Sequence, residues 1–173
     1  MSNNNDPLLN FRNATLDDLA IIVDIYNSTI DSRLATADLQ PVSIESKLDW
    51  FHKHNAFSRP IWIITNESNQ VIGWTSFQDF YGRPAYQQTA EISIYLDENY
   101  RGRGFGKNII SHAIQSCPSL GIQNLLAFIF EHNITSLSLA QELGFEEWGH
   151  LKEIALMDDK YYGLKIMGLK ITP

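Results

Sequence analysis

A short glycine-rich turn carries three of the thirteen basic residues of the chain. The segment Arg101-Gly-Arg-Gly-Phe-Gly-Lys107 joins a predicted strand to a predicted helix. Its glycines permit positive φ and a close approach of the backbone to a ligand, and the N–H groups that open a helix suit a phosphate group. A solvated loop before a helix is the alternative interpretation. The spacing fits neither a Walker P-loop nor a dinucleotide-binding turn, because Asn108 follows the lysine and the glycines alternate.

A carboxylate on the preceding strand is the candidate for acid–base chemistry. Glu91 stands in a segment, residues 89–96, whose apolar and polar residues alternate, so that the two faces of the strand differ. Partial burial there would raise the pKa of Glu91, and such a group suits a general base that takes a proton from an amine. The alternative interpretation is a strand carboxylate paired with a neighbouring Lys or Arg.

The spacing of apolar residues predicts the elements that position these groups. Helices are predicted at residues 16–30, 43–54, 107–116 and 133–143. Strands are predicted at residues 8–13, 61–65, 71–77, 89–96, 122–130, 145–153 and 161–171. The order β-α-α-β-β-β-α-β-α-β-β indicates a mixed sheet with helices packed on its faces. We expect a polar tail at residues 1–7 and a single domain at residues 8–173.

The composition excludes several classes of protein. The chain has 173 residues, 44% apolar and 19% charged, with a net charge of −7, which is typical of one globular domain and disfavours a nucleic-acid binder. No apolar run approaches the roughly twenty residues that span a membrane. Cys117 is the only cysteine, so there is no intramolecular disulfide or multi-cysteine zinc site, and His52 and His54 lack partners with ligand spacing. We expect a cytoplasmic protein without a metal, a nucleic-acid partner or a membrane partner.

Two blocks of sequence resemble the GCN5-related N-acetyltransferase (GNAT) family. They are Arg101-x-x-Gly104-x-Gly106 and Asn133-x-x-Ser136-x-x-Leu139-x-x-x-Leu143-Gly144-Phe145, and the resemblance extends over residues 8–171. Further segments resemble the phosphinothricin and methionine sulfone acetyltransferase branch. They are Ile25-Tyr-Asn, Thr36, Trp50-Phe51, Ile72-Gly-Trp74, Arg83-x-x-Tyr86, Thr89-Ala-Glu91 and Ile94-Tyr-Leu96.

The resemblance implies a fold and an activity. The fold is α+β, a twisted, mostly antiparallel mixed sheet that is splayed near its centre and flanked by four helices. The activity is transfer of an acetyl group from acetyl-CoA directly to the amino group of a small amino-acid-like molecule within a ternary complex. Glu91 corresponds to the glutamate base of that branch and would act directly or through water. A homodimer is also implied, with Leu164 and Ile166 as reasonable contributors.

The resemblance also assigns the acetyl-CoA contacts. Backbone groups at Ile94, Tyr95 and Leu96 would face the pantetheine arm, and one N–H among them would donate to the oxyanion. Asn133 would contact the pantetheine or stabilise the opened strand, act as an N-cap, or do both. For Ser136, packing beneath the cofactor is the preferred interpretation. The amides of residues 103–107 would cradle the pyrophosphate. The cofactor-binding turn as a whole comprises Arg101, Gly102, Arg103, Gly104, Phe105, Gly106 and Lys107.

The substrate side rests on the loop and strand that precede Glu91. Arg83 and Tyr86 would bind a carboxylate, since an arginine forms a bidentate fork with such a group, although a surface-loop arginine is the alternative. Thr89 would hydrogen-bond the amine or the carboxylate. The pocket wall would comprise Trp74, Ser76 and Phe77, for which ordinary core packing of the two aromatic residues is the alternative.

One position departs from the family pattern. Family members often carry Tyr or His directly after the Leu of the second block, whereas here Leu139 is followed by Ala140. The thiolate therefore leaves unassisted, or else Tyr95, Tyr161 or Tyr162 protonates it. The same departure keeps open a CoA-binding module without catalysis. A protein or peptide N-acetyltransferase is the other alternative, although that group more often carries the tyrosine that is missing at position 140.

Overall fold

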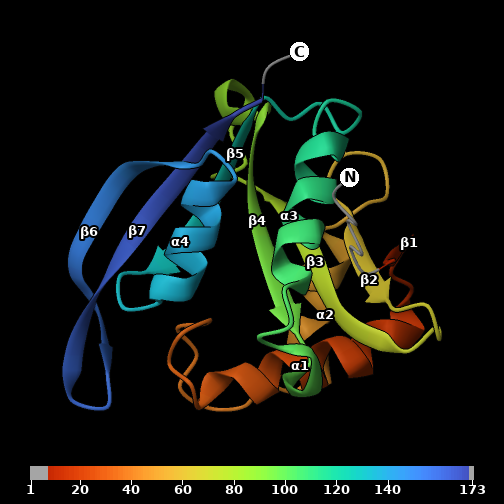
Figure 1. The fold of residues 1–173 in the computed structure, drawn as a ribbon, viewed down its shortest axis with the longest axis horizontal. Helices are drawn as coiled ribbons and strands as arrows, with labels where there is room; N and C mark the ends of the chain where they lie inside the picture. Colours follow the sequence, from red (N-terminus) through yellow and green to blue (C-terminus); the bar gives the residue numbers. More distant parts are fainter. Residues whose placement is uncertain (1–7, 172–173) are drawn as a thin grey trace, which may run out of the picture.

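A computed structural model describes residues 8–171, and the tail predicted at residues 1–7 lies outside the described residues. Seven strands form one sheet in the order β1-β2-β3-β4-β5-β7-β6 (Figure 1). All neighbouring strands pair antiparallel except β4 and β5, which are parallel. The strands are β1 (Asn10–Asn13), β2 (Ile61–Thr65), β3 (Val71–Asp79), β4 (Thr89–Leu96), β5 (Asn124–Phe130), β6 (Glu146–Met157) and β7 (Lys160–Lys170).

Four α-helices cover the two faces of the sheet. They are α1 (Leu19–Ile30), α2 (Ile44–His52), α3 (Phe105–Ser116) and α4 (Ile134–Glu142). Buried residues of α1 pack on one face with Trp74 of β3, and residues of α2 pack against the same cluster. Residues of α3 and α4 form the core on the opposite face with Phe77 and Ala90 (Figure 1). None of the helices that the structure describes is long and apolar enough to cross a membrane.

The predicted fold class and order of elements are confirmed, with small differences at the ends of elements. Helix α3 begins at Phe105, two residues before the predicted start, because Gly104 caps it in a left-handed conformation with φ of 84°. Strand β6 continues to Met157, four residues past its predicted end. It does so through an irregular stretch in which Glu153 has φ of 51°, and such a bulge interrupts the alternation on which the prediction relied.

Side-chain alternation on β3 and β4 divides the residues between two environments. The strands pair with Gln78 opposite Glu91, Ser76 opposite Ser93 and Trp74 opposite Tyr95. Because successive side chains of a strand point to opposite faces, these six side chains share the face that α1 and α2 cover. All six side chains line one pocket on this face of the sheet.

The pairing of β4 with β5 stops soon after it begins. The parallel ladder covers only residues 89–91 of β4 and 124–126 of β5. Beyond this point β4 remains paired with β3 as far as Leu96, and β5 remains paired with β7 as far as Phe130. The two strands diverge in Figure 1, so the predicted splay near the centre of the sheet is confirmed.

Candidate active site

The splay between β4 and β5 opens into a cleft of about 970 Å³. Its walls are residues 91–96 of β4 and 127–130 of β5, and the glycine-rich turn and the first residues of α3 form one end. Asn133, Ser136, Leu139 and Ala140 line it from α4 and the start of that helix. Residues 34–37, from the loop after α1, also line it, and so do Ile154, Ala155 and Leu164 of the β6–β7 hairpin.

Strand β4 directs backbone groups into this cleft. The N–H of Asp97 donates to the carbonyl of Ile72 on β3 at 2.9 Å. In an antiparallel ladder the residues that face the partner alternate, so Tyr95 and Ser93 also face β3, whereas Ile94 and Leu96 face the side that β5 has left. The carbonyl of Leu96 accepts from Nε of Arg101 at 2.9 Å. The N–H groups of Ile94 and Leu96 therefore point toward the cleft.

The glycine-rich turn combines a left-handed backbone with a helix start. Gly102 and Gly104 have φ of 71° and 84°, values that residues with a Cβ adopt only with strain. Helix α3 follows at once, so its first N–H groups lack partners within the helix. A Cβ on Gly106 would lie 3.0 Å from Cδ2 of Leu139, so glycine there lets α3 approach α4 closely. The turn has the chemistry that a phosphate group requires.

The three cations of the turn have partners within the protein. Arg101 donates from Nη2 to Oγ of Ser28 at 2.5 Å, in addition to its bond with β4, and so ties the turn to α1. The guanidinium of Arg103 lies over the ring of Tyr100, 5.6 Å from its centroid, and Nζ of Lys107 lies 2.6 Å from the carboxylate of Glu142. The hydrogen bonds of Arg101 therefore connect the turn to β4 and to α1. The sequence did not reveal this structural role.

Asn133 has two hydrogen bonds at the start of α4. Its Oδ1 accepts from the N–H of Ser136 at 3.1 Å, which is the N-cap role that the sequence offered as one reading. Its Nδ2 donates to the carbonyl of Leu34 at 3.1 Å, in the loop that closes the cleft. The same loop is held by His132, whose Nε2 bonds the carbonyl of Arg33 at 2.8 Å, and by an ion pair of 2.8 Å between Arg33 and Asp158. Sequence reasoning missed this loop, because its partners lie 99 to 125 residues away.

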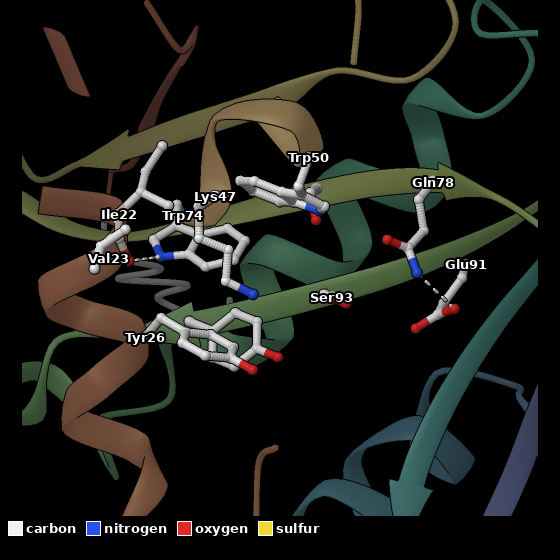
Figure 2. Close-up of a pocket in the computed structure, with 11 residues that line it drawn as sticks. Ile22, Val23, Tyr26, Lys47, Trp50, Trp74, Gln78, Glu91 and Ser93 are labelled. Atoms are coloured by element: carbon white, nitrogen blue, oxygen red, sulfur yellow. Dashed lines mark hydrogen bonds between the residues drawn. The ribbon is translucent and has the colours of Figure 1, made fainter. Parts of the chain in front are cut away.

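A second pocket of about 220 Å³ lies on the α1 and α2 side of β4 (Figure 2). It shares Glu91, Ser93 and Tyr95 with the cleft, so the two cavities meet at β4. The pocket is lined by Ile22, Val23, Tyr26, Lys47, Trp50, Trp74, Ser76, Gln78, Glu91, Ser93 and Tyr95.

Glu91 stands at the junction of the cleft and the pocket. Its carboxylate accepts a hydrogen bond of 2.9 Å from the side-chain amide of Gln78 (Figure 2). Burial raises the pKa of Glu91 above its ordinary value, and the Gln78 hydrogen bond opposes this in part. Among residues 8–171, no ion pair involves Glu91, so the alternative of a salt-bridged strand carboxylate does not describe this structure.

Aromatic side chains wall the pocket. Trp74 is 3% exposed and donates from Nε1 to the carbonyl of Ile22 at 3.0 Å, and the ring of Tyr95 stacks on it at 4.5 Å. The hydroxyl of Tyr26 bonds both Thr36 and Asp38. Burial, helped by the hydrogen bond to Asp38, raises the pKa of Tyr26 to about 12, so this phenol stays neutral at physiological pH.

Only some of the predicted substrate residues line the pocket. Trp74 and Ser76 line the pocket. Phe77 is completely buried on the opposite face of β3, as its odd spacing from Trp74 requires, so the core-packing alternative describes it. The hydroxyl of Thr89 accepts from Asn124 at the paired end of the splay.

Two further predicted residues, Arg83 and Tyr86, lie outside both cavities. They are exposed in the loop between β3 and β4, where Tyr86 packs against the ring of Phe80 at 5.4 Å. Sequence reasoning missed Tyr26, Lys47 and Gln78 as pocket residues. For Gln78 the alternation from Trp74 and Ser76 was an available signal.

The residues considered as acids are separated in space. Of the three tyrosines, only Tyr95 lines the cleft, and burial raises its pKa well above its ordinary value. Tyr161 is 59% exposed, and Tyr162 packs on His132 at 4.3 Å.

Cys117 is buried, and burial raises the pKa of its thiol to about 12, which makes it unreactive. Within residues 8–171 no group of three His, Cys, Asp or Glu side chains could hold a metal ion.

Comparisons with known proteins agree with this geometry. The chain is 50% identical over 155 residues, covering 90% of it and 94% of the relative, to YwnH of Bacillus subtilis (strain 168), which is provisionally named a phosphinothricin acetyltransferase. It is 26% identical over 162 residues, 94% of each chain, to an L-methionine sulfoximine/L-methionine sulfone acetyltransferase of Pseudomonas aeruginosa.

A solved structure extends the comparison. The GNAT superfamily phosphinothricin acetyltransferase from Sinorhizobium meliloti, in complex with AcCoA, is 28% identical, with a TM-score of 0.86 and coverage of 94% of this chain and 88% of that one. The sequence profile of the acetyltransferase (GNAT) family matches residues 22–145. The chain therefore belongs to the GNAT family of N-acetyltransferases, in the group that resembles phosphinothricin and methionine sulfoximine acetyltransferases.

Proposed function

We propose that this protein uses acetyl-CoA to acetylate the amino group of a small amino-acid-like molecule by direct transfer. The observation that carries the proposal is the meeting of two cavities at Glu91, a long cleft that ends at a glycine-rich turn and a small aromatic pocket. A cleft with exposed strand N–H groups at one end and a helix start at the other suits a thioester joined to a pyrophosphate. The small pocket suits the amine.

The residues present fit acetyl-CoA along the whole cleft. The N–H groups at the start of α3 would hold the pyrophosphate, with Gly102, Gly104 and Gly106 leaving room for it. The backbone of Ile94 and Leu96 would bind the pantetheine arm, and an N–H of this pair would donate to the acetyl carbonyl. When bound, acetyl-CoA supplies the activated acetyl group.

Glu91 would serve as the base. A protonated amine has no lone pair, so a carboxylate must accept the proton before or during attack. Burial that raises the pKa of Glu91 makes it a better proton acceptor, and Gln78 holds the carboxylate in place. The amine nitrogen then bonds the acetyl carbon while the carbon–sulfur bond breaks, and the proton stays on Glu91 or on a water beside it.

The thiolate would leave without a protein acid. Ala140 is 3% exposed at the edge of the cleft and carries no proton. Tyr95 is the one tyrosine of the three candidates that lines the cleft, but its raised pKa makes it a weak acid. A thiol with an ordinary pKa of about 8.5 is a tolerable leaving group at neutral pH, so positioning of the two reactants carries most of the catalysis.

The size of the second pocket favours a small acceptor over a protein. Its volume of about 220 Å³ is below the roughly 300–1,000 Å³ of sites for drug-sized ligands. A free amino acid fits such a volume, whereas a protein N-terminus would need an open groove leading away from it. The loop before β4 lines neither of the two cavities.

The test measures release of the CoA thiol from acetyl-CoA. The acceptors are a panel of amino acids, including phosphinothricin and methionine sulfone, and, in separate reactions, peptides. Turnover of amino acids and not of peptides supports the proposal. Turnover of peptides alone would indicate a protein acetyltransferase, and binding of CoA without turnover of any amine would indicate a non-catalytic module. Cys117 is buried with a raised pKa, so it adds little to the thiol blank.

We also propose that two copies associate through the hairpin of β6 and β7. Strand β6 is at the edge of the sheet, and the hairpin exposes Leu156 and Tyr161 at 51% and 59%. Of the two residues that the resemblance suggested, Leu164 lines the cleft and Ile166 is half-buried beside Gly149, so Leu156 and Tyr161 take their place in the proposal. An exposed apolar edge strand is a surface that proteins usually cover. Light scattering should give the mass of a dimer for the wild type and of a monomer for Leu156→Glu, and a monomeric wild type would refute the proposal.

A further inference from the structure

The aromatic pocket contains one cation that the transfer chemistry does not explain. Among the described residues that line the pocket, Lys47 of α2 is the only Lys, Arg or His. It is half-buried, and Trp50, one turn further along the same helix, lines the same pocket. Figure 2 shows its ammonium inside the pocket, between Trp74 and Tyr26.

The ammonium of Lys47 is positioned without being neutralised. It lies 4.5 Å from the centroid of the Tyr26 ring, a cation–π distance. That ring is held in turn, because the Tyr26 hydroxyl bonds Thr36 and Asp38. Within residues 8–171 none of the ion pairs includes Lys47. A half-buried cation with aromatic contacts and no carboxylate partner is ready to bind an anion.

The other end of the pocket carries the opposite charge. Glu91 and Gln78 lie away from Lys47 in Figure 2, and Ser93 lies between them on β4. The neighbouring Ser76 is also small, so the floor between the two charges leaves space. A small ligand that carries both an amine and an acid group, with the amine turned toward Glu91 and the acid group toward Lys47, matches this arrangement of charges.

We infer that Lys47 binds the carboxylate of the acceptor amino acid and thereby turns its amino group toward Glu91. This inference rests on the proposed function and replaces Arg83, which lies outside both cavities, as the carboxylate anchor. Lys47 is a specificity residue rather than a catalytic one, because it contacts neither the proton nor the acetyl group. The pocket selects a free α-amino acid over the corresponding amide or decarboxylated amine.

The test compares Lys47→Met with Lys53→Met. Methionine keeps an apolar stem of similar length and removes the charge. Lys53 is exposed at the end of the same helix and lies outside the pocket, so its replacement makes the same change in net charge. Each variant is assayed with methionine sulfone and with methionine sulfone carboxamide, and the KM for acetyl-CoA is measured alongside.

The expected result is a loss of discrimination confined to Lys47→Met. Its KM for methionine sulfone should rise about 10- to 100-fold, the range for a lost charge-assisted hydrogen bond. Its KM for the carboxamide, its kcat at saturation and its KM for acetyl-CoA should stay within about twofold of wild type. An equal loss for the acid and the carboxamide, or the same change in Lys53→Met, would overturn the inference.

A binding measurement keeps this inference separate from the proposed function. Trp50 and Trp74 line the pocket, so tryptophan fluorescence should report methionine sulfone binding even without turnover. If the wild type binds it and Lys47→Met binds it about 10-fold or more weakly, Lys47 is the anchor whether or not acetylation follows. If neither protein turns it over, the proposed function fails. If the two bind it equally, or if the wild type does not bind it, the role of Lys47 is refuted.

Discussion

The two halves of β4 differ in what lies beside them. At residues 89–91 the strand has a neighbour on each side, β3 and β5, and Ala90 is completely buried. From Ile92 to Leu96 it keeps β3 alone, and its other edge faces the cleft. At the paired end, side chains bond other side chains of the protein, as the hydroxyl of Thr89 does in accepting a hydrogen bond from Asn124. Backbone groups at the open end are left for a ligand.

This difference shows how one strand serves both stability and binding. An unpaired strand edge is normally a liability, because its N–H and C=O groups lack partners. Here the open edge is closed off from other chains by α4 and by the loop at residues 34–37, which line the same cleft. Glu91 is the last paired residue, so it is fixed by the ladder while its side chain reaches the junction of both cavities.

Replacement of Glu91 should have the largest effect. Glu91→Gln keeps the shape and the contact with Gln78 but cannot accept a proton, so kcat should fall about 10²- to 10⁴-fold. In the wild type kcat/KM should drop as the pH falls through the raised pKa of Glu91, and in the variant this acid limb should disappear. Rates measured from pH 5 to pH 9 check this, and an unchanged pH profile with full kcat would show that another group is the base.

The same variant should be more stable at high pH. A carboxyl whose pKa is raised in the folded state stabilises the fold below its ordinary pKa of about 4.3 and loses that contribution as the pH rises through the raised value. Glu91→Gln avoids this loss. Its Tm should therefore exceed that of the wild type at pH 8, and the difference should shrink toward pH 4. Thermal unfolding at the two pH values measures it.

Filling the open end should be the next largest effect. Gly106→Val places a Cβ 3.0 Å from Leu139 and adds two methyl groups between α3 and α4. The KM for acetyl-CoA should rise at least about 10-fold, and the free energy of unfolding should fall by about 1–3 kcal/mol through overpacking. Gln115→Val, exposed on the same helix, controls for β-branching. Equal KM values for the two variants would mean that the turn does not hold acetyl-CoA.

The same contrast separates what the sequence could predict from what it could not. Alternation and helical spacing are local, and they located every strand and α-helix that the structure describes, but not the short 3-10 helices at Pro84–Tyr86 and Glu98–Tyr100. Alternation also placed Phe77 on the face opposite Trp74, a signal that the choice of Phe77 as a wall residue overlooked. Glu91 was predicted from its position on the strand and from its family motif, and it lies where the two cavities meet.

Long-range contacts were beyond the reach of local patterns. Lys47 enters the pocket only because α2 packs beside β3 and β4, and no residue near Lys47 in the sequence indicates this. Arg101 bonds Ser28 across 73 residues, so its charge could not be recognised as a structural tie. Thr89 is on the same face of β4 as Glu91. It lies outside the site because β4 is still paired with β5 at this position, where the hydroxyl of Thr89 bonds Asn124.

A smaller effect should follow at the paired end. Thr89→Val removes the hydroxyl that accepts from Asn124 at 3.1 Å. Loss of this one bond should lower the free energy of unfolding by about 1 kcal/mol, or the Tm by about 2–4 °C for a chain of this size. The KM for the amino acid should not change. Asn124→Ala should cost a similar amount, and the two changes together should be less than additive. A raised KM in Thr89→Val would return Thr89 to the substrate site.

The smallest effect should come from the loop that closes the open end. Asp158→Asn breaks the ion pair that holds Arg33 beside the hairpin of β6 and β7. The pair is exposed to water, so the KM for acetyl-CoA should rise only about two- to fivefold, and salt should abolish the difference. The pKa of Asp158 is lowered by its hydrogen bond to Arg33, so the tie is present above an ordinary carboxyl pKa of about 3.9 and is lost only as the pH falls through the lowered value.

A matched variant decides whether that ion pair acts through the cleft. Glu147→Gln breaks an ion pair of the same length, to Lys165 on the same pair of strands, but it touches no residue of the loop. If the KM for acetyl-CoA rises in Asp158→Asn and not in Glu147→Gln, the loop at residues 34–37 helps to retain acetyl-CoA. If both variants match the wild type, Asn133 and His132 hold the loop without help, because their bonds to its backbone are unaffected by either change.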